Sequence, residues 1–143
     1  MPSSSMEPTI TAGSNVKVDL NAFRNSDPSR WDVVTFSPPK AATSSKENQT
    51  WIMRIVGLPG ETVDFSGSNI QVDGTQLTLP IDLKELHYLG VEALKGSNRI
   101  TRTRIVLGAG EYFVLGDNSS NANDSRYWGA LSRGRISGKL VAP

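Results

Sequence analysis

The sequence contains no cysteine and only one histidine, His87. Without cysteine, the chain can form neither a disulfide framework nor a thiolate zinc site, although this absence is compatible with any redox compartment. A single histidine and scattered carboxylates do not provide a metal-ligand cluster of the usual spacing. We therefore expect neither a metal ion nor another cofactor.

Long hydrophobic runs and an excess of charge of one sign are also absent. No segment approaches the roughly 20 apolar residues that a membrane helix requires, and none resembles a signal peptide. The net charge is +1 and 20% of the residues are charged, which gives no indication of nucleic-acid binding. A length of 143 residues fits one domain. We expect this chain by itself to be soluble and not to bind nucleic acid.

Hydrophobic periodicity predicts strands rather than helices. Apolar and polar residues alternate in segments such as 16–20, and β-branched blocks such as 32–36 are short. Asp73-Gly74 lies between two such segments and predicts a tight hairpin, because both central positions of that turn need positive φ. Only 82–86 and 91–94 favour short helices. We predict an all-β fold of antiparallel sheets that form a partly closed, barrel-like core.

Four separated segments carry recognisable motifs. They are residues 2–9 (Pro-Ser-Ser-Ser-Met-Glu-Pro-Thr), 30–36 (Arg-Trp-Asp-Val-Val-Thr-Phe), 51–60 (Trp-Ile-Met-Arg-Ile-Val-Gly-Leu-Pro-Gly) and 116–129, which begins Gly-Asp-Asn and ends Asp-Ser-Arg-Tyr-Trp-Gly. In this order they resemble the motifs of type I signal peptidases. These are membrane-associated serine endopeptidases with a Ser-Lys dyad, and they remove signal peptides from exported preproteins.

The resemblance implies catalytic positions. A serine hydroxyl must lose its proton as it attacks, and in this family a lysine with a lowered pKa accepts that proton. Ser5 matches the nucleophile, and Met53 occupies the position of the lysine. Ser3 matches the residue whose hydroxyl forms the oxyanion hole together with the Ser5 backbone amide.

Further residues are expected around these positions. Four apolar side chains are predicted to line the substrate cleft or to pack in the core: Met6, Ile10, Trp51 and Ile52. Four others are expected to support the site without touching substrate: Arg54, Ala122, Asp124 and Arg126. Residues 116–118 are predicted to form a tight turn. The implied substrates are signal-peptide segments with small residues at two alternating positions, the Ala-x-Ala type.

The chain departs from the family motifs at three positions. Trp31 replaces a usual glycine, and Ala122 replaces a common serine whose hydroxyl orients the lysine. Met53 fills about the volume of a lysine stem but cannot accept a proton. Two other candidate bases, Lys46 and His87, are expected to be solvated surface residues. The chain is therefore predicted to be inactive or strongly impaired.

The origin of Met53 remains open between natural loss and deliberate substitution. An alternative is a natural non-catalytic homologue that binds signal-peptide-like segments or assists a partner peptidase; a lysine codon at position 53 would exclude it. A weaker alternative is a self-cleaving Ser-Lys regulator, with Ala12-Gly13 or Ala109-Gly110 as its cleavage site.

The resemblance also implies domain organisation and location. We expect residues 1–63 and 109–143 to form the catalytic core and residues 64–108 to form an inserted β subdomain packed on it. We expect a native membrane anchor upstream of Met1, with the catalytic domain on the trans side, either periplasmic or extracytoplasmic.

Overall fold

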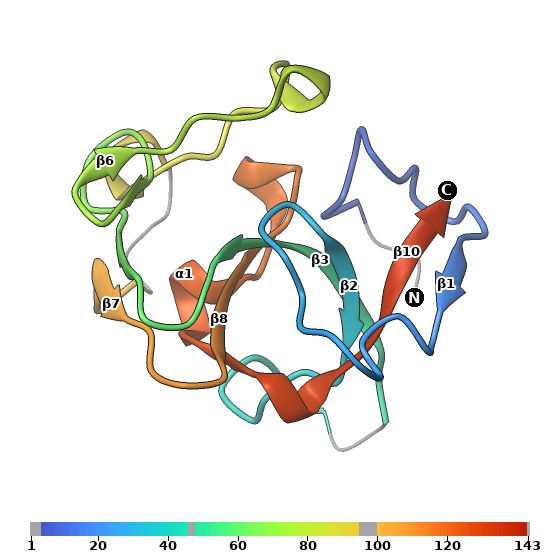
Figure 1. Ribbon diagram of the computed structural model, residues 1–143. Coiled ribbons are helices and arrows are strands. Elements are labelled where there is room, and N and C mark those ends of the chain that lie inside the picture. The colour runs from blue at the N-terminus through green and yellow to red at the C-terminus, as the bar shows by residue number, and fades with distance from the viewer. Residues whose placement is uncertain (1–3, 46–47, 95–99, 143) are drawn as a thin grey trace.

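The fold consists of two antiparallel sheets and short helical turns (Figure 1). A computed structural model describes residues 4–45, 48–94 and 100–142. The larger sheet contains β1 (Lys17–Asp19), β2 (Val33–Phe36), β3 (Trp51–Gly57), β8 (Glu111–Leu115), β9 (Leu131–Ser132) and β10 (Ile136–Ala142). Its strand order is β1-β10-β2-β3-β8-β9. The all-β prediction is confirmed, and the sheet is only partly closed because β1 and β9 remain edges.

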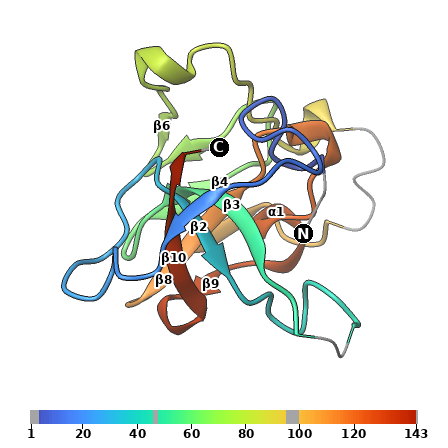
Figure 2. The same cartoon turned by 90° about the vertical axis from the view of Figure 1, so that its right-hand side faces the viewer.

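The middle of the larger sheet positions the candidate site. β2 and β3 lie side by side through the centre of the molecule, with β10 on the other side of β2 (Figure 2). All four residues of β2 and six of the seven in β3 are buried. Strands covered on both faces favour the continuous apolar runs found here. Met53 lies in this buried strand, in register with Val34.

The smaller sheet contains β4 (Thr62–Asp64), β5 (Gln71–Val72), β6 (Thr75–Gln76) and β7 (Arg104–Val106), in the order β6-β5-β4-β7. Its strands overlap the interval 64–108, for which an inserted unit was predicted, although β4 begins two residues earlier. One apolar cluster joins the two sheets: Val63 and Ile105 pack with Val56, Phe113 and Leu115. The two sheets therefore share a continuous core.

Local turn chemistry agrees with the hairpin prediction. Asp73 and Gly74 connect β5 to β6 with φ of 51° and 82°. Of the two segments predicted to be helical, 82–86 overlaps the 3₁₀ turn η1 (Ile81–Leu83) at two residues, and 91–94 contains the 3₁₀ turn η2 (Val91–Ala93).

The prediction that no other segment is helical is wrong. The structure adds α1 (Ser125–Trp128) and the 3₁₀ turns η4 (Ser119–Asn121) and η5 (Arg133–Arg135). The Asp124 side chain caps α1 by accepting a hydrogen bond from the Arg126 amide. An N-cap aspartate is a recognised start signal, but a four-residue helix is too short to show helical periodicity.

Candidate active site

A cleft of about 400 Å³ brings together five of the predicted positions, including those of the nucleophile, the lysine and its orienting serine. Ser5, Met53 and Ala122 come from the N-terminal turn, from β3 and from the segment before α1, and all three line this cleft. The remaining lining residues are Ser4, Trp51, Ile52, Ser120, Asn121, Asn123 and Tyr127. The floor is therefore apolar at Met53 and Ala122, and hydroxyl and amide groups surround it.

The turn that carries Ser5 is held by the segment after β8. The Asn118 amide donates to the Ser5 carbonyl oxygen at 2.8 Å, and the Asn118 side-chain amide donates to the Ser4 carbonyl at 3.0 Å. Asn121 Nδ2 lies 2.6 Å from Ser4 Oγ. These bonds fix the backbone on both sides of the candidate nucleophile.

Gly116 allows this close approach. A Cβ atom at position 116 would lie 2.7 Å from the Ser5 carbonyl oxygen and 2.5 Å from the Ala122 Cβ. Neither neighbour is the flexible end of a long side chain, so neither can move aside easily. The glycine is therefore required by the packing of the Ser5 turn against this segment.

Met53 offers no proton acceptor to Ser5. Its side chain is buried, with 3% of its surface exposed. Within the described parts of the chain, no lysine, histidine, aspartate or glutamate lines the cleft, and Tyr127 is its one ionisable residue. No group of three or more histidine and acidic residues that could hold a metal ion occurs among the described residues either.

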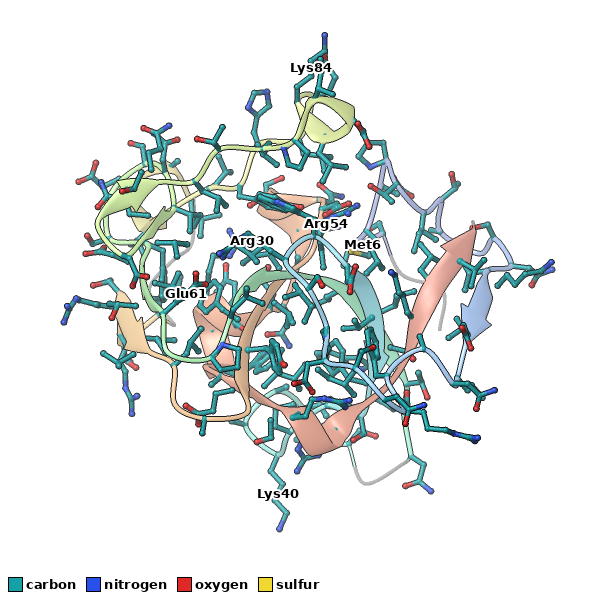
Figure 3. All side chains as sticks on the ribbon, viewed as in Figure 1. Met6, Arg30, Lys40, Arg54, Glu61 and Lys84 are labelled. Carbon is teal, nitrogen blue, oxygen red and sulfur yellow. The ribbon has the colours of Figure 1, made fainter. Side chains whose placement is uncertain are left out.

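His87, one of the two other candidate bases, does not line this cleft. His87 is exposed and lines a different cavity, together with Leu77 and Leu86. Lys40 and Lys84 project into solvent at opposite ends of the molecule (Figure 3). Lys46 and Ser3, the predicted oxyanion-hole residue, lie outside the described residues.

Arg54 points from β3 into the interior, as Figure 3 shows, and forms a buried ion pair with Asp117. Its Nε and Nη2 atoms lie 3.0 and 2.7 Å from the two carboxylate oxygens, and Nη1 donates to the Trp31 carbonyl. Burial acts to lower the pKa of Arg54, but the hydrogen bonds and charge of Asp117 outweigh it and raise this pKa. The expectation of a simple tight turn at 116–118 therefore missed the buried role of Asp117.

Asp124 and Arg126 form a second buried pair, and neither side chain is exposed. The guanidinium binds both carboxylate oxygens at 2.8 Å and also donates to Ser119 and to the Leu89 carbonyl. Burial raises the pKa of Asp124, whereas Arg126 and the Gly116 amide oppose this shift. All of these partners are N–H donors, so the geometry is that of an ionised carboxylate. The pair fixes the loop behind Ala122.

The four predicted cleft residues divide between two cavities. Trp51 and Ile52 line the cleft of Ser5, whereas Met6 and Ile10 line a neighbouring cavity of about 360 Å³. Ile52 lines both cavities and separates them. Tyr88 belongs to none of the sequence motifs, and Asp117 was predicted only as part of a turn, although Tyr88 donates to Asp117 and the Asp117 amide contacts Met6 next to Ser5.

The backbone explains why glycine is usual at position 31. Trp31 has φ of 79°, in the left-handed region that glycine adopts without steric cost. Its amide donates to the Ile55 carbonyl, and its own carbonyl accepts from Arg54. The left-handed backbone at Trp31 therefore orients the carbonyl oxygen that accepts a hydrogen bond from the Arg54 side chain.

The fold and the serine cleft point to a peptidase family, and comparison with known proteins identifies it. The profile of the family described as "Signal peptidase, peptidase S26" matches residues 1–143, so the chain belongs to this family.

Individual relatives agree with this assignment. "Probable signal peptidase I-2" of Synechocystis is 32% identical over 97% of this chain and 58% of its own length. "Signal peptidase I V" of Bacillus subtilis is 31% identical over 95% of this chain and 78% of its own length. The crystal structure of a signal peptidase I from Enterococcus faecalis is 28% identical, with a TM-score of 0.56, and the match covers 81% of this chain and 98% of that one. The chain spans between about half and four fifths of the curated relatives it matches.

Proposed function

We propose that this chain is the peptide-binding domain of a type I signal peptidase homologue, with Ser5 in the nucleophile position and with strongly impaired hydrolysis. The observation that carries the proposal is the composition of one cleft. Ser5 lies there together with Met53 and Ala122, where the family's lysine and serine are expected, and no described lining residue supplies a replacement base.

The chemical consequence follows from the mechanism of serine hydrolases. Attack by Ser5 Oγ on a scissile carbonyl requires a group that accepts the hydroxyl proton and later protonates the leaving amine. A thioether can do neither. Loss of the base in such a unit typically lowers the rate by several orders of magnitude. Substrate binding depends on the shape of the cleft and is retained.

The proposed substrates are extended signal-peptide segments with small residues at alternating positions. Successive side chains of an extended peptide point in opposite directions, so every second residue faces the same surface. Two neighbouring cavities divided by Ile52 suit such a repeat. Closely packed floors reject larger side chains by steric overlap.

The proposed location is the trans side of a membrane. The family is membrane-associated, and its substrates meet it at the membrane surface. None of the helices in the described residues is long and apolar enough to cross a bilayer. In this proposal the domain is held at the membrane by an upstream anchor.

Cleavage of a fluorogenic Ala-x-Ala peptide tests the proposal. The parent chain, Met53→Lys and the double variant Met53→Lys/Ala122→Ser are compared, each with and without Ser5→Ala. We expect no Ser5-dependent cleavage by the parent and a clear gain in the double variant. Robust Ser5-dependent cleavage by the parent would refute the inactivity, and a double variant that neither cleaves nor binds the peptide would refute the peptidase assignment.

A natural binding or accessory protein is the second candidate. It is favoured by the retention of both buried ion pairs and of an open cleft, although the two positions that serve the base have changed. If the chain is such a binding protein, we expect a signal peptide to bind it with micromolar or better affinity and to remain intact. A lysine codon at position 53 of the natural gene contradicts this candidate.

A further inference from the structure

The Asp117 carboxylate joins three segments that are far apart in the sequence. Its side chain has no exposed surface. Arg54 of β3 donates to both carboxylate oxygens, Thr9 of the Ser5 turn donates to Oδ2, and the Tyr88 hydroxyl donates to Oδ1. Only Tyr88 comes from the segment that connects β6 to β7.

Tyr88 is firmly placed. Its ring is buried in the apolar cluster shared by the two sheets, with 6% of its surface exposed. The next residue, Leu89, accepts a hydrogen bond from Arg126 through its carbonyl at 3.0 Å and donates its amide to Ser119 Oγ at 2.9 Å. Burial, followed by the neighbouring Asp117 carboxylate, raises the pKa of Tyr88, so its hydroxyl remains a donor.

The carboxylate in turn determines where the Ser5 turn lies. The Asp117 amide donates to Met6 Sδ at 3.4 Å, and the following amide, that of Asn118, donates to the Ser5 carbonyl. Rotation of the Asp117 side chain would break the hydrogen bond that its carboxylate accepts from Thr9, and would thereby loosen the Ser5 turn against these two amides.

We propose that Tyr88 is a positioning residue for Ser5: its hydroxyl fixes the Asp117 carboxylate, and Asp117 and Asn118 hold the nucleophile turn. Without the hydroxyl, Oδ1 keeps only the Arg54 Nε bond, and the carboxylate turns toward Arg54. The effect on Ser5 is local, because the Tyr88 ring and its apolar contacts remain.

Backbone amide exchange measured by NMR on the parent chain tests this inference without any assumption about activity. Two amides report on the Ser5 turn: Asn118 donates to the Ser5 carbonyl, and Ile10 donates to the Met6 carbonyl. In Tyr88→Phe we expect both to exchange about 10-fold faster or more, the factor expected for loss of one hydrogen bond to a charged group. The Ile55 amide, which donates to the Asp32 carbonyl in the core, is the internal reference and stays unchanged.

Tyr112→Phe is the matched control. Tyr112 is also a buried tyrosine, but it packs in the cluster around β2 and β3, whereas Tyr88 packs in the other cluster and donates to Asp117. Its variant leaves the Asn118 amide unchanged. Equal acceleration at Asn118 and Ile55 in Tyr88→Phe would mean a general loss of stability, and no change at Asn118 would mean no coupling; either result overturns the proposal. A slowly exchanging Tyr88 hydroxyl proton in the parent spectrum is expected as well, and its absence contradicts the bond to Asp117 even if the variant fails to fold.

A kinetic experiment extends the inference and rests on the proposed function. In the Met53→Lys/Ala122→Ser background, Tyr88→Phe is expected to lower kcat about 10-fold with KM nearly unchanged, because misplacement of the nucleophile affects the reaction more than binding. An unchanged kcat contradicts positioning. If the double variant neither cleaves nor binds the peptide, the proposed function fails, whereas the amide exchange still decides the role of Tyr88.

Discussion

Replacing Met53 by lysine places a titratable amine in the site and makes the stability of the protein depend on pH. The side chain at position 53 is 3% exposed, and its neighbours in β3 and β2 are buried. Burial disfavours the charged form of lysine and lowers its pKa by up to 3 to 5 units. Because Met53 also borders an open cleft, we take the lower limit of about 3 units.

The sign and size of the effect follow from proton linkage. The unfolded chain has a lysine pKa of about 10.4, and the folded chain then has one of about 7.4. Between these values the unfolded state binds more protons, so the free energy of unfolding of Met53→Lys rises with pH. At about 1.36 kcal/mol per unit, the penalty approaches about 4 kcal/mol below the folded pKa and disappears above about pH 10.4.

Urea unfolding of Met53→Lys, of the parent and of Met53→Leu between pH 6 and 10.5 measures this effect. Met53→Leu carries no titratable group, so its difference from the parent stays below about 1.5 kcal/mol and does not change with pH. We expect Ala122→Ser to reduce the penalty, because its hydroxyl offers a partner to the amine. A Met53→Lys curve that runs parallel to the parent at all pH values would show a fully hydrated ammonium and refute the buried-base geometry.

Three further predictions concern the surroundings of the site. Gly116→Ala is expected to destabilise the fold by about 1–3 kcal/mol, measured by urea unfolding, because its methyl group overlaps the Ser5 carbonyl; a change below about 0.5 kcal/mol contradicts the close approach. Trp31→Gly should be about 1 kcal/mol more stable than Trp31→Ala in thermal unfolding, because only glycine tolerates the positive φ without cost; the reverse order contradicts that conformation. Arg30 lowers the pKa of Glu61, so their ion pair stabilises the fold above the unfolded pKa of about 4.3, and this contribution disappears as pH falls through the folded value. Glu61→Gln should therefore cost up to about 1 kcal/mol at pH 7 and almost nothing near pH 2, and an equal cost at both pH values contradicts this.

Local features of the fold could be predicted from the sequence because they depend on few neighbours. The Asp73-Gly74 hairpin needs only two residues with positive φ, and both adopt it. The pairing of Arg54 with Asp117 could not be predicted, since the two residues are 63 positions apart. Gly-Asp-Asn is typical of a turn, and no local pattern indicates that its carboxylate is buried.

The candidate site also contains some residues that the sequence predicted and others that it could not predict. The motifs indicated that Ser5, Met53 and Ala122 belong together, and one cleft contains all three. Tyr88 belongs to no motif and lies 29 positions from the carboxylate that it contacts. A tyrosine in an apolar segment predicts core packing, whereas the partner of its hydroxyl depends on tertiary contacts that no local pattern contains.

The hydrogen bonds between the two ends of the chain have a consequence for the order of assembly during synthesis. Ser5 is translated well before Asn118, which donates to the adjacent Ser4 and lies 114 positions further along the chain. Among the strands of the described residues, β1 likewise pairs with β10 alone, more than 100 positions further along the sequence. Contacts between such distant residues form slowly, because a long loop must close before they can be made. The turn that carries Ser5 is therefore placed only after the segment that follows β8 has been made, and a nascent chain that ends before β8 contains the serine without the site.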